Sequence, residues 1–390
     1  MRGSVFAAAA AGILAGLALL PSPGAAQMDS PASGEDRAYL AAMSLPAAEQ
    51  RMIEHKVAVA PYIHMLTAPA TSGPAPLANE VVIEQSDGLV LVDAGKTRGA
   101  GKRIVALIRS ISPKPVKAVI ITHWHQDHVM GLGPIVEAWP NARIIASVRT
   151  RDHILNDDSY RGVPCALADS AERDRSRAAA LTGYARQFAA SLHDPALSAE
   201  ERSGWAETLG VLALRIADEK GTYLVPPGVT FDSRFAIDDP VAPVEARFIG
   251  PGHTDGDIIV WMPKQKVIAA GDMVVAPIPY GSTDVLAWPE TLGRLRDLGP
   301  DIVIPGHGPV ERGTDYVERL IALLVRIRGE AQRLAAQPKL SDDQVQAKAD
   351  LSAQKTLFAG VDKWRGYWFD QYVVPDVAQA YRQLATRPAR

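Results

Sequence analysis

Four side chains that can bind a metal ion lie within six residues, directly after an apolar segment of the chain. The apolar segment is residues 117–121, and the polar motif after it contains His123, His125, Asp127 and His128. Because the segment is short and rich in β-branched residues, it predicts a buried strand that ends where the polar motif begins. Imidazole and carboxylate groups are ligands that zinc accepts. The His-x-His pair can reach one ion while Asp127 and His128 face a neighbouring position, so the spacing suits two adjacent metal ions.

A polar turn with histidines on the surface is the alternative interpretation of this motif. The chain has nine histidines in 390 residues, so a chance His-x-His-x-Asp-His pattern is improbable. The motif therefore favours a metal site.

Three more residues of the same kinds follow apolar segments later in the chain. His253 lies in a Gly-Pro-Gly-His-Thr loop, Asp272 ends the segment Ala-Gly-Asp, and His307 lies in Pro-Gly-His-Gly. Glycines beside the two histidines permit tight turns that can direct a side chain inward. A site built from loops at strand ends requires this arrangement. Asp93 ends another apolar segment, where it is either an ordinary turn residue or a support for a metal ligand.

The elements that must position these residues alternate between strands and helices. Short β-rich segments separated by turn residues predict a meander or hairpin early in the chain. An amphipathic helix at residues 102–111 leads into the strand before His123, and a second short helix is predicted at 150–155. The predicted strands are residues 57–66, 80–85, 89–93, 117–121, 142–147, 229–237, 244–249, 257–262, 266–270 and 302–304.

Two regions are predicted to be mainly helical. Residues 166–220 are rich in Ala, Arg, Glu and Leu without a convincing β-segment, which predicts a helical insertion. Residues 313–390 predict a helical C-terminal extension with helices at 315–336, 341–353 and 364–385. We expect the aromatic side chains of the last helix to pack against the core. His153 and His193 fall beside and inside the insertion, and we expect neither to bind a metal.

Composition limits what else the chain can be. With 47% hydrophobic residues and a net charge of −3, the chain can bury a large core and lacks the basic character of nucleic-acid-binding proteins. We therefore expect a small-molecule substrate and no nucleic acid. The single cysteine, Cys165, excludes an intrachain disulfide and a multi-thiolate metal site.

Residues 1–26 have the pattern of a secretory signal peptide. Arg2 precedes an apolar segment at residues 5–20, and small residues follow as far as Ala26. We expect cleavage near Ala26 and a periplasmic or secreted protein without stable membrane insertion. A retained membrane anchor is the alternative, but the apolar segment is short for one. Residues 27–56 predict a linker and a helix at 36–55.

As a set, these motifs resemble those of the metallo-β-lactamase superfamily. The resemblance covers about residues 57–312 and rests on the His-x-His-x-Asp-His motif, on the loops of His253, Asp272 and His307, and on Asp93 in Val-Asp-Ala-Gly. It implies an α/β (α+β) fold, the αββα metallo-β-lactamase sandwich, with the metals at one edge between two sheets. The helical insertion and the C-terminal extension would be additions to this domain.

The resemblance also implies a role for each candidate residue. His123, His125 and His253 would bind the first metal ion, and Asp127, His128 and His307 would bind the second. Asp272 would bridge the two ions, and Asp93 would organise the histidine loop. Asp127 is in addition the candidate catalytic residue, because it could orient the attacking hydroxide. We expect two divalent metal ions per chain, with Zn²⁺ first and iron or manganese as alternatives.

The activity implied by such a site is hydrolysis by a metal-activated hydroxide. Our first hypothesis is an exported hydrolase of an ester, lactone or thioester, because Asp272 resembles the corresponding acid of glyoxalase II and the lactonases. Hydrolysis of a β-lactam, a phosphoester or a sulfate ester is an alternative, as is iron-dependent chemistry of the sulfur dioxygenase or oxygen-reducing type. A binding protein without catalysis is another alternative. The insertion is expected to cap the site or to form a homodimer contact.

One departure from the classical zinc β-lactamases argues against antibiotic hydrolysis. Those enzymes have cysteine where this chain has Asp272 and lysine three residues later, where this chain has Val275. Losing a charge-assisted contact to the drug's carboxylate costs about 1.5 to 3 kcal/mol, or roughly one to two powers of ten in affinity. Other β-lactamase subclasses lack that lysine, so β-lactams remain an alternative substrate.

Overall fold

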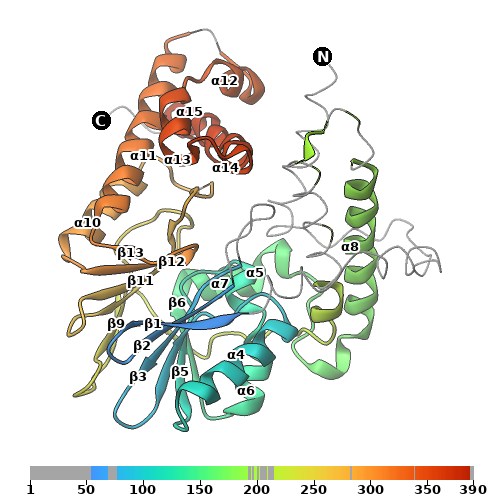
Figure 1. Ribbon diagram of the computed structural model, residues 1–390, viewed down its shortest axis with the longest axis vertical. Helices are drawn as coiled ribbons and strands as arrows, with labels where there is room; N and C mark the ends of the chain where they lie inside the picture. The colour runs from blue at the N-terminus through green and yellow to red at the C-terminus, as the bar shows by residue number, and fades with distance from the viewer. Residues whose placement is uncertain are drawn as a thin grey trace.

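The computed structural model describes residues 54–68, 77–191, 215–281, 283–337 and 339–386, together with positions 195, 197–199, 202 and 209. These residues form two β-sheets that pack against each other, with helices on their outer sides (Figure 1). The strand order is β1-β2-β3-β4-β5-β6-β7 in the first sheet and β13-β12-β11-β10-β9-β8 in the second. This architecture is the αββα sandwich that the resemblance implied.

Both sheets combine parallel and antiparallel strands. Strands β4 to β7 pair in parallel, as do β11 and β12, and the remaining pairs are antiparallel. The first sheet consists of β1 (His55–Ala60), β2 (Ile63–Thr67), β3 (Glu80–Glu84), β4 (Leu89–Val92), β5 (Val116–Ile120), β6 (Arg143–Ser147) and β7 (Val229–Phe231). The second consists of β8 (Arg234–Ile237), β9 (Val244–Arg247), β10 (Ile259–Met262), β11 (Val267–Val275), β12 (Ile302–His307) and β13 (Glu311–Arg312).

Alternate residues of the strands build the core between the sheets. Val81 and Ile83 of β3 belong to this core, together with Val260 and Met262 of β10. Val82 belongs instead to the cluster beneath the helices of the first sheet. Successive strand residues point to opposite faces, so a strand that is apolar on both faces needs a second sheet on one side and helices on the other.

The helices cover the outer face of each sheet. Ile104 and Ile108 of α4 pack on the first sheet, and Leu292 of α10 and Leu320 of α11 pack on the second. Helices on the first sheet are α4 (Arg98–Ile111), α5 (Gln126–Val129), α6 (Leu132–Ala138) and α7 (Val148–Asn156), and α7 leads into the short helix η1 (Asp158–Tyr160). The second sheet is covered by α10 (Trp288–Asp297) and α11 (Asp315–Ala335).

The C-terminal extension is helical and lies at one end of the sandwich (Figure 1). After α11 it contains α12 (Asp342–Lys348), α13 (Ser352–Ala359), α14 (Lys363–Trp368), the π-helix η3 (Phe369–Val373) and α15 (Val374–Thr386). Trp364, Trp368 and Phe369 are buried, as expected. The single helix predicted at 341–353 is wrong, because the chain turns at Asp350, whose backbone N–H donates to Glu330 of α11.

Three predicted strand boundaries are also wrong. Residues 57–66 form the hairpin of β1 and β2, which turns at Tyr62 with φ 69°. Residues 229–237 divide into β7 and β8, which belong to different sheets, because the chain crosses between the sheets at this point. Strand β11 continues to Val275 rather than ending at residue 270, because it keeps pairing in parallel with β12 through register shifts on both sides of Gly271.

The predicted helical insertion and N-terminal segment are described only in part. Between residues 166 and 220 the structure has the short helix η2 (Leu167–Asp169), α8 (Ala171–Ser191) and a helical turn at 215–218. The signal peptide, the linker and nearly all of the helix at 36–55 lie outside the described residues, and His55 already belongs to β1. None of the helices in the described ranges has the length and apolar character needed to span a bilayer.

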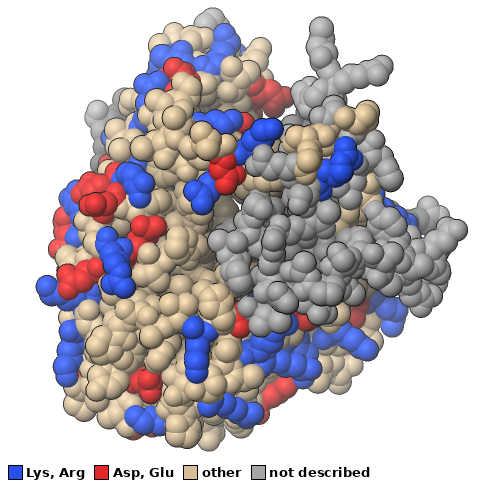
Figure 2. Space-filling model, viewed as in Figure 1, with Lys and Arg blue, Asp and Glu red and all other residues tan. Residues whose placement is uncertain are grey.

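Acidic and basic side chains are interspersed on the face shown in Figure 2.

Candidate metal centre

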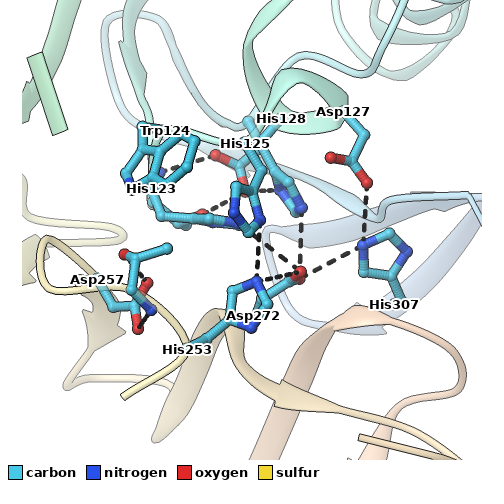
Figure 3. Close-up of polar contacts among 12 residues, drawn as sticks. His123, Trp124, His125, Asp127, His128, His253, Asp257, Asp272 and His307 are labelled. Atoms are coloured by element: carbon cyan, nitrogen blue, oxygen red, sulfur yellow. Dashed lines mark hydrogen bonds and ion pairs between the residues drawn. The ribbon is translucent and has the colours of Figure 1, made fainter. Parts of the chain in front are cut away.

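The seven residues predicted as metal ligands converge on one place in the structure (Figure 3). They come from the turn after β5 and helix α5, from the loop between β9 and β10, and from β11 and β12. One group contains His123, His125, His253 and Asp272, and the other contains Asp127, His128 and His307. In each group the atoms that could bind an ion lie within 4.8 Å of one another. Strands far apart in sequence thus bring together the two ligand sets implied by the resemblance.

Asp272 divides its carboxylate oxygens between the two groups. Oδ1 lies 3.3 Å from Nε2 of His128 and 3.4 Å from Nε2 of His307. Oδ2 lies 3.5 Å from Nε2 of His253 and 3.7 Å from Nε2 of His123. Two ligands that are each about 2.1 Å from one tetrahedral ion lie roughly 3.4 Å apart. The observed distances therefore suit a carboxylate that contributes one oxygen to each of two ions.

Buried atoms in both groups lack hydrogen-bond partners. Within the described part of the chain, this is true of Nε2 of His123, Nε2 of His128 and Oδ1 of Asp272. Buried polar atoms are rarely left in this state. The second nitrogen of each imidazole is engaged, because Nδ1 of His123 lies 3.1 Å from Oγ1 of Thr122 and Nδ1 of His128 lies 2.8 Å from Asp93. The donor set thus fits metal ions, which would take the remaining lone pairs.

Asp93 organises the histidine loop through its carboxylate. Oδ1 accepts a hydrogen bond from the backbone N–H of Thr122 at 2.8 Å, and Oδ2 accepts one from the Thr122 hydroxyl at 2.8 Å. Oδ2 also contacts Nδ1 of His128. Asp93 follows β4 with φ 60°, a backbone conformation that non-glycine residues seldom adopt. These contacts hold Asp93 beneath the site, in the supporting position considered for it from the sequence.

The surroundings of the histidines in the first group favour their neutral forms. Burial and the neighbouring His253 lower the pKa of His125 to about 3. Burial and His128 lower the pKa of His123 well below its usual range, and burial lowers that of His253 as well. Nε2 of His253 lies 2.9 Å from Nδ1 of His125. A neutral imidazole offers a lone pair, so this group can bind a cation without first losing a proton.

The acidic residues around the second group favour the binding of positive charge, either protons on its histidines or a metal ion. Burial opposes protonation of His307, but Asp272 and Asp127 outweigh it and raise the pKa of His307 to about 10. Burial likewise opposes protonation of His128, whose pKa Asp272 and Asp93 raise well above its usual range. Asp127 stays ionised, because His307 and His128 lower its pKa against the effect of burial. A cation at this position would replace the protons held by the two imidazoles.

Two glycines allow the strands to approach closely around Asp272. A Cβ at Gly306 of β12 would lie 2.0 Å from Oδ1 of Asp272. A Cβ at Gly271 would lie 2.5 Å from Oγ1 of Thr122, and Gly271 has φ 52°. Only glycine leaves room for these contacts, so the Ala-Gly-Asp and Pro-Gly-His sequences fix the position of the carboxylate as well as supplying ligands.

Asn79 supports His307 and was missed by the sequence analysis. Its side-chain amide donates to the backbone oxygens of Pro305 and Gly308, each at 2.9 Å, and its backbone N–H donates to the oxygen of Gly306 at 2.7 Å. Asn79 is buried just before β3 in the other sheet. The contacts span more than 220 residues, so no local pattern in the sequence could have revealed them.

The loop that carries His253 is braced by Asp257, another residue that was missed. Its Oδ2 accepts a hydrogen bond from the backbone N–H of Thr254 at 2.8 Å, and its Oδ1 accepts one from the Thr254 hydroxyl at 2.5 Å. Burial raises the pKa of Asp257 to about 7. In the sequence, the only feature that could have indicated this role is the pair of acids Asp255 and Asp257. Acidic residues at such spacing are also common in ordinary turns.

His153 lies beside the site but in neither ligand group. Its ring stacks on Trp124 with centroids 5.0 Å apart, and its Nε2 lies 2.9 Å from Oδ1 of Asp255. Trp124 in turn packs edge-on against His125. His153 therefore belongs to the surroundings of the first group, and His193 lies outside the described residues.

The two-sheet fold and the paired ligand groups define the class of this protein. The family model described as the Metallo-beta-lactamase superfamily matches residues 76–307, which is more than half of the chain. The chain belongs to this superfamily.

The chain is similar to several characterised members of the superfamily. It is 26% identical over 255 residues to the linear primary-alkylsulfatase of Pseudomonas sp. (strain ATCC 19151), a match that covers 62% of this chain and 43% of the relative. It is 28% identical over 125 residues to the metallo-beta-lactamase type 2 of Bacteroides fragilis, covering 30% of this chain and 49% of the relative. The chain thus spans less than half the length of either relative. The solved metallo-beta-lactamase from Pontibacter korlensis is 17% identical, with a TM-score of 0.49 and coverage of 70% of this chain and 99% of that chain.

Proposed function

We propose that this protein is a metal-dependent hydrolase with two zinc ions, which cleaves an ester-type bond. The division of the Asp272 carboxylate between two ligand groups is the observation that carries the proposal. His123, His125 and His253 would hold the first ion, and Asp127, His128 and His307 the second. When bound, such ions make water a nucleophile at neutral pH and polarise the bond that is attacked.

Among the acidic and histidine side chains of the second ligand group and Asp272, Asp127 is the one that is open to an attacking water. Its side chain is 17% exposed, whereas those of His128, His307 and Asp272 are at most 2% exposed. An ionised carboxylate at the open side of the site can accept a hydrogen bond from water and fix its direction. Asp93 would meanwhile hold the His128 imidazole in place.

We propose carboxylic esters, lactones and thioesters as the first substrate class. The support is Asp272, an oxygen ligand in the position where the classical zinc β-lactamases have cysteine, together with the absence of lysine at Val275. Val275 is buried at the end of β11 and pairs with His307 of β12. The Val275 side chain therefore offers no charge for the carboxylate of a β-lactam.

A sulfate ester of a primary alcohol is the second candidate substrate. The support is the similarity to the alkylsulfatase, which is 26% identical to this chain over 255 residues and matches 62% of it. A sulfate ester also presents an oxygen to be polarised and a bond to be cleaved by water, so the same ligand groups could serve it.

A side-by-side substrate panel tests the proposed function. Zinc-loaded protein would be assayed with p-nitrophenyl butyrate, a γ-lactone, a glutathione thioester, dodecyl sulfate, a penicillin, a cephalosporin and a carbapenem. We expect kcat/KM to be highest for a carboxylic ester, lactone or thioester. A higher value for dodecyl sulfate would favour the second candidate, and a β-lactam as the best substrate would overturn both.

A further inference from the structure

The segment after β11 connects both ligand groups and carries a tyrosine, Tyr280. At its start, the backbone N–H of Ala276 donates to the oxygen of His307 at 3.1 Å. Near its end, the backbone N–H of Thr283 donates to the oxygen of His253 at 2.9 Å. Tyr280 lies between these two attachments. Its position is therefore tied to the backbone of one predicted ligand from each group.

The ring of Tyr280 is held between His307 and the C-terminal extension. It packs edge-on against the imidazole of His307 with centroids 5.1 Å apart, and it also contacts the ring of Tyr372, with centroids 5.0 Å apart. Tyr372 in turn stacks on Trp368 with centroids 5.5 Å apart and planes at 19°. Trp368 is buried. The row of aromatic rings therefore helps to fix the ring of Tyr280 beside His307.

Helix α15 reinforces this placement through the backbone of the same segment. The side-chain amides of Gln379 and Gln383 donate to the oxygen of Thr283 at 3.3 Å and 2.7 Å. The backbone N–H of Leu286 lies 3.3 Å from Oε1 of Gln383. The extension is thus hydrogen-bonded to the loop that forms one side of the metal centre.

The hydroxyl of Tyr280 is buried without a hydrogen-bond partner among the described residues. Other buried tyrosines near the site are partnered, since Tyr316 donates to the oxygen of Val275 at 2.7 Å and Tyr160 donates to the oxygen of Trp124. A buried hydroxyl without a partner is unfavourable, and such exceptions call for an explanation. A partner supplied by a bound substrate would explain why the hydroxyl is retained beside His307.

We propose that Tyr280 is a substrate-contacting catalytic residue whose hydroxyl donates a hydrogen bond to the acyl oxygen that gains negative charge as water attacks. Tyr372 acts as a positioning residue, because it holds the ring of Tyr280. This assignment rests on the proposed ester hydrolysis. Donors directed at a developing oxyanion contribute about 10²- to 10³-fold in kcat, so the hydroxyl should affect kcat more than KM.

The first test is Tyr280→Phe, which removes only the hydroxyl. With p-nitrophenyl butyrate we expect kcat to fall about 100-fold, KM to change little, and the zinc content per chain to stay the same. Because the hydroxyl has no partner among the residues that the structure describes, the melting temperature should not fall. Tyr316→Phe is the matched control for stability and should lower the melting temperature, because it removes a hydrogen bond to Val275. Tyr381→Phe, on the same helix as Gln379, is the control for activity.

The second test needs no turnover and so separates this inference from the proposed function. Butyrate, the carboxylate product of the ester, would be titrated into the cobalt(II)-substituted protein and followed by visible absorption. We expect Tyr280→Phe to raise the Kd for butyrate about tenfold without altering the spectrum of the unliganded protein. If the wild type cleaves no ester, the proposed function fails while this titration still decides the role of Tyr280. An equal Kd in both proteins, a wild type that does not bind butyrate, or a variant that loses zinc would overturn the assignment.

Discussion

Nδ1 of His128 lies 2.8 Å from Oδ2 of Asp93, and both side chains are buried. This contact makes Nδ1 a donor to Asp93 and leaves Nε2, which lies 3.3 Å from Oδ1 of Asp272, as the nitrogen that would bind the second ion. The second ligand group therefore depends on a residue that does not itself face the ion. Because the same carboxylate accepts two hydrogen bonds from Thr122, it also ties the histidine loop to β4.

Asp93→Asn tests this dependence with little change in size. The amide replaces one acceptor by a donor, which would face either the N–H of Thr122 or the imidazole of His128. We expect the affinity for the second ion to fall about 10- to 100-fold, measured by competition with a zinc chelator. Asp87→Asn, at an exposed turn of the same sheet, should leave the affinity unchanged. Equal affinities in the Asp93 variant and the wild type would contradict the role given to Asp93.

Asp272→Ala tests the bridge between the two groups. A shared carboxylate offsets the repulsion between two dications, so its loss should leave about one tightly bound ion per chain, with the second ion lost first. Elemental analysis after dialysis measures this stoichiometry. Asp301→Ala, which removes an exposed acid before β12, is the control. Two tightly retained ions in the Asp272 variant would show that this carboxylate does not bridge them.

Gly306→Ala tests the close packing around Asp272. The added Cβ would lie 2.0 Å from Oδ1 of Asp272 and 2.8 Å from its backbone nitrogen, so the carboxylate must move. Overpacking of this kind costs about 1 to 3 kcal/mol in the free energy of unfolding, and we expect weaker zinc binding as well. Gly329→Ala in α11 meets no atom within 4 Å and should instead stabilise the protein by about 0.5 to 1 kcal/mol. Unchanged zinc affinity in the Gly306 variant would contradict the packing argument.

The two ions should differ in their dependence on pH. The pKa of His307 is raised to about 10 and that of His128 is raised as well, so the second ion must displace protons at neutral pH. The pKa of His125 is lowered to about 3, so no proton competes there between about pH 5 and 8. Lowering the pH through this range should therefore release the second ion before the first. Zinc content after dialysis at successive pH values measures this order, and simultaneous loss of both ions would contradict it.

Sequence patterns identified the candidate ligands, which the structure brings together, because each motif that contains them follows an apolar segment. The strand before His123 is β5, and the His-x-His-x-Asp-His motif begins directly after it. The position of Asp272 was less accurate, because β11 continues past it to Val275. Its register shifts depend on pairing with β12, and no local pattern reports the pairing of two strands. For the same reason, residues 229–237 gave no sign that β7 and β8 belong to different sheets.

The residues that support the candidate ligands were much harder to predict than the candidate ligands themselves. Asn79 acts across the two sheets on the loop of His307, and asparagine before a strand is commonplace. Tyr280 is in a segment whose role could not be read from its composition. Its surroundings arise from Tyr372, 92 residues later in the chain, and that contact exists only when the extension is folded onto the sandwich.

X-ray diffraction from crystals of the zinc-loaded protein, measured on both sides of the zinc absorption edge, tests the central claim most directly. The account predicts two anomalous peaks per chain. One should lie among His123, His125 and His253, the other among Asp127, His128 and His307, with a different oxygen of Asp272 bound to each. A single peak, or two peaks of which only one contacts Asp272, would contradict it.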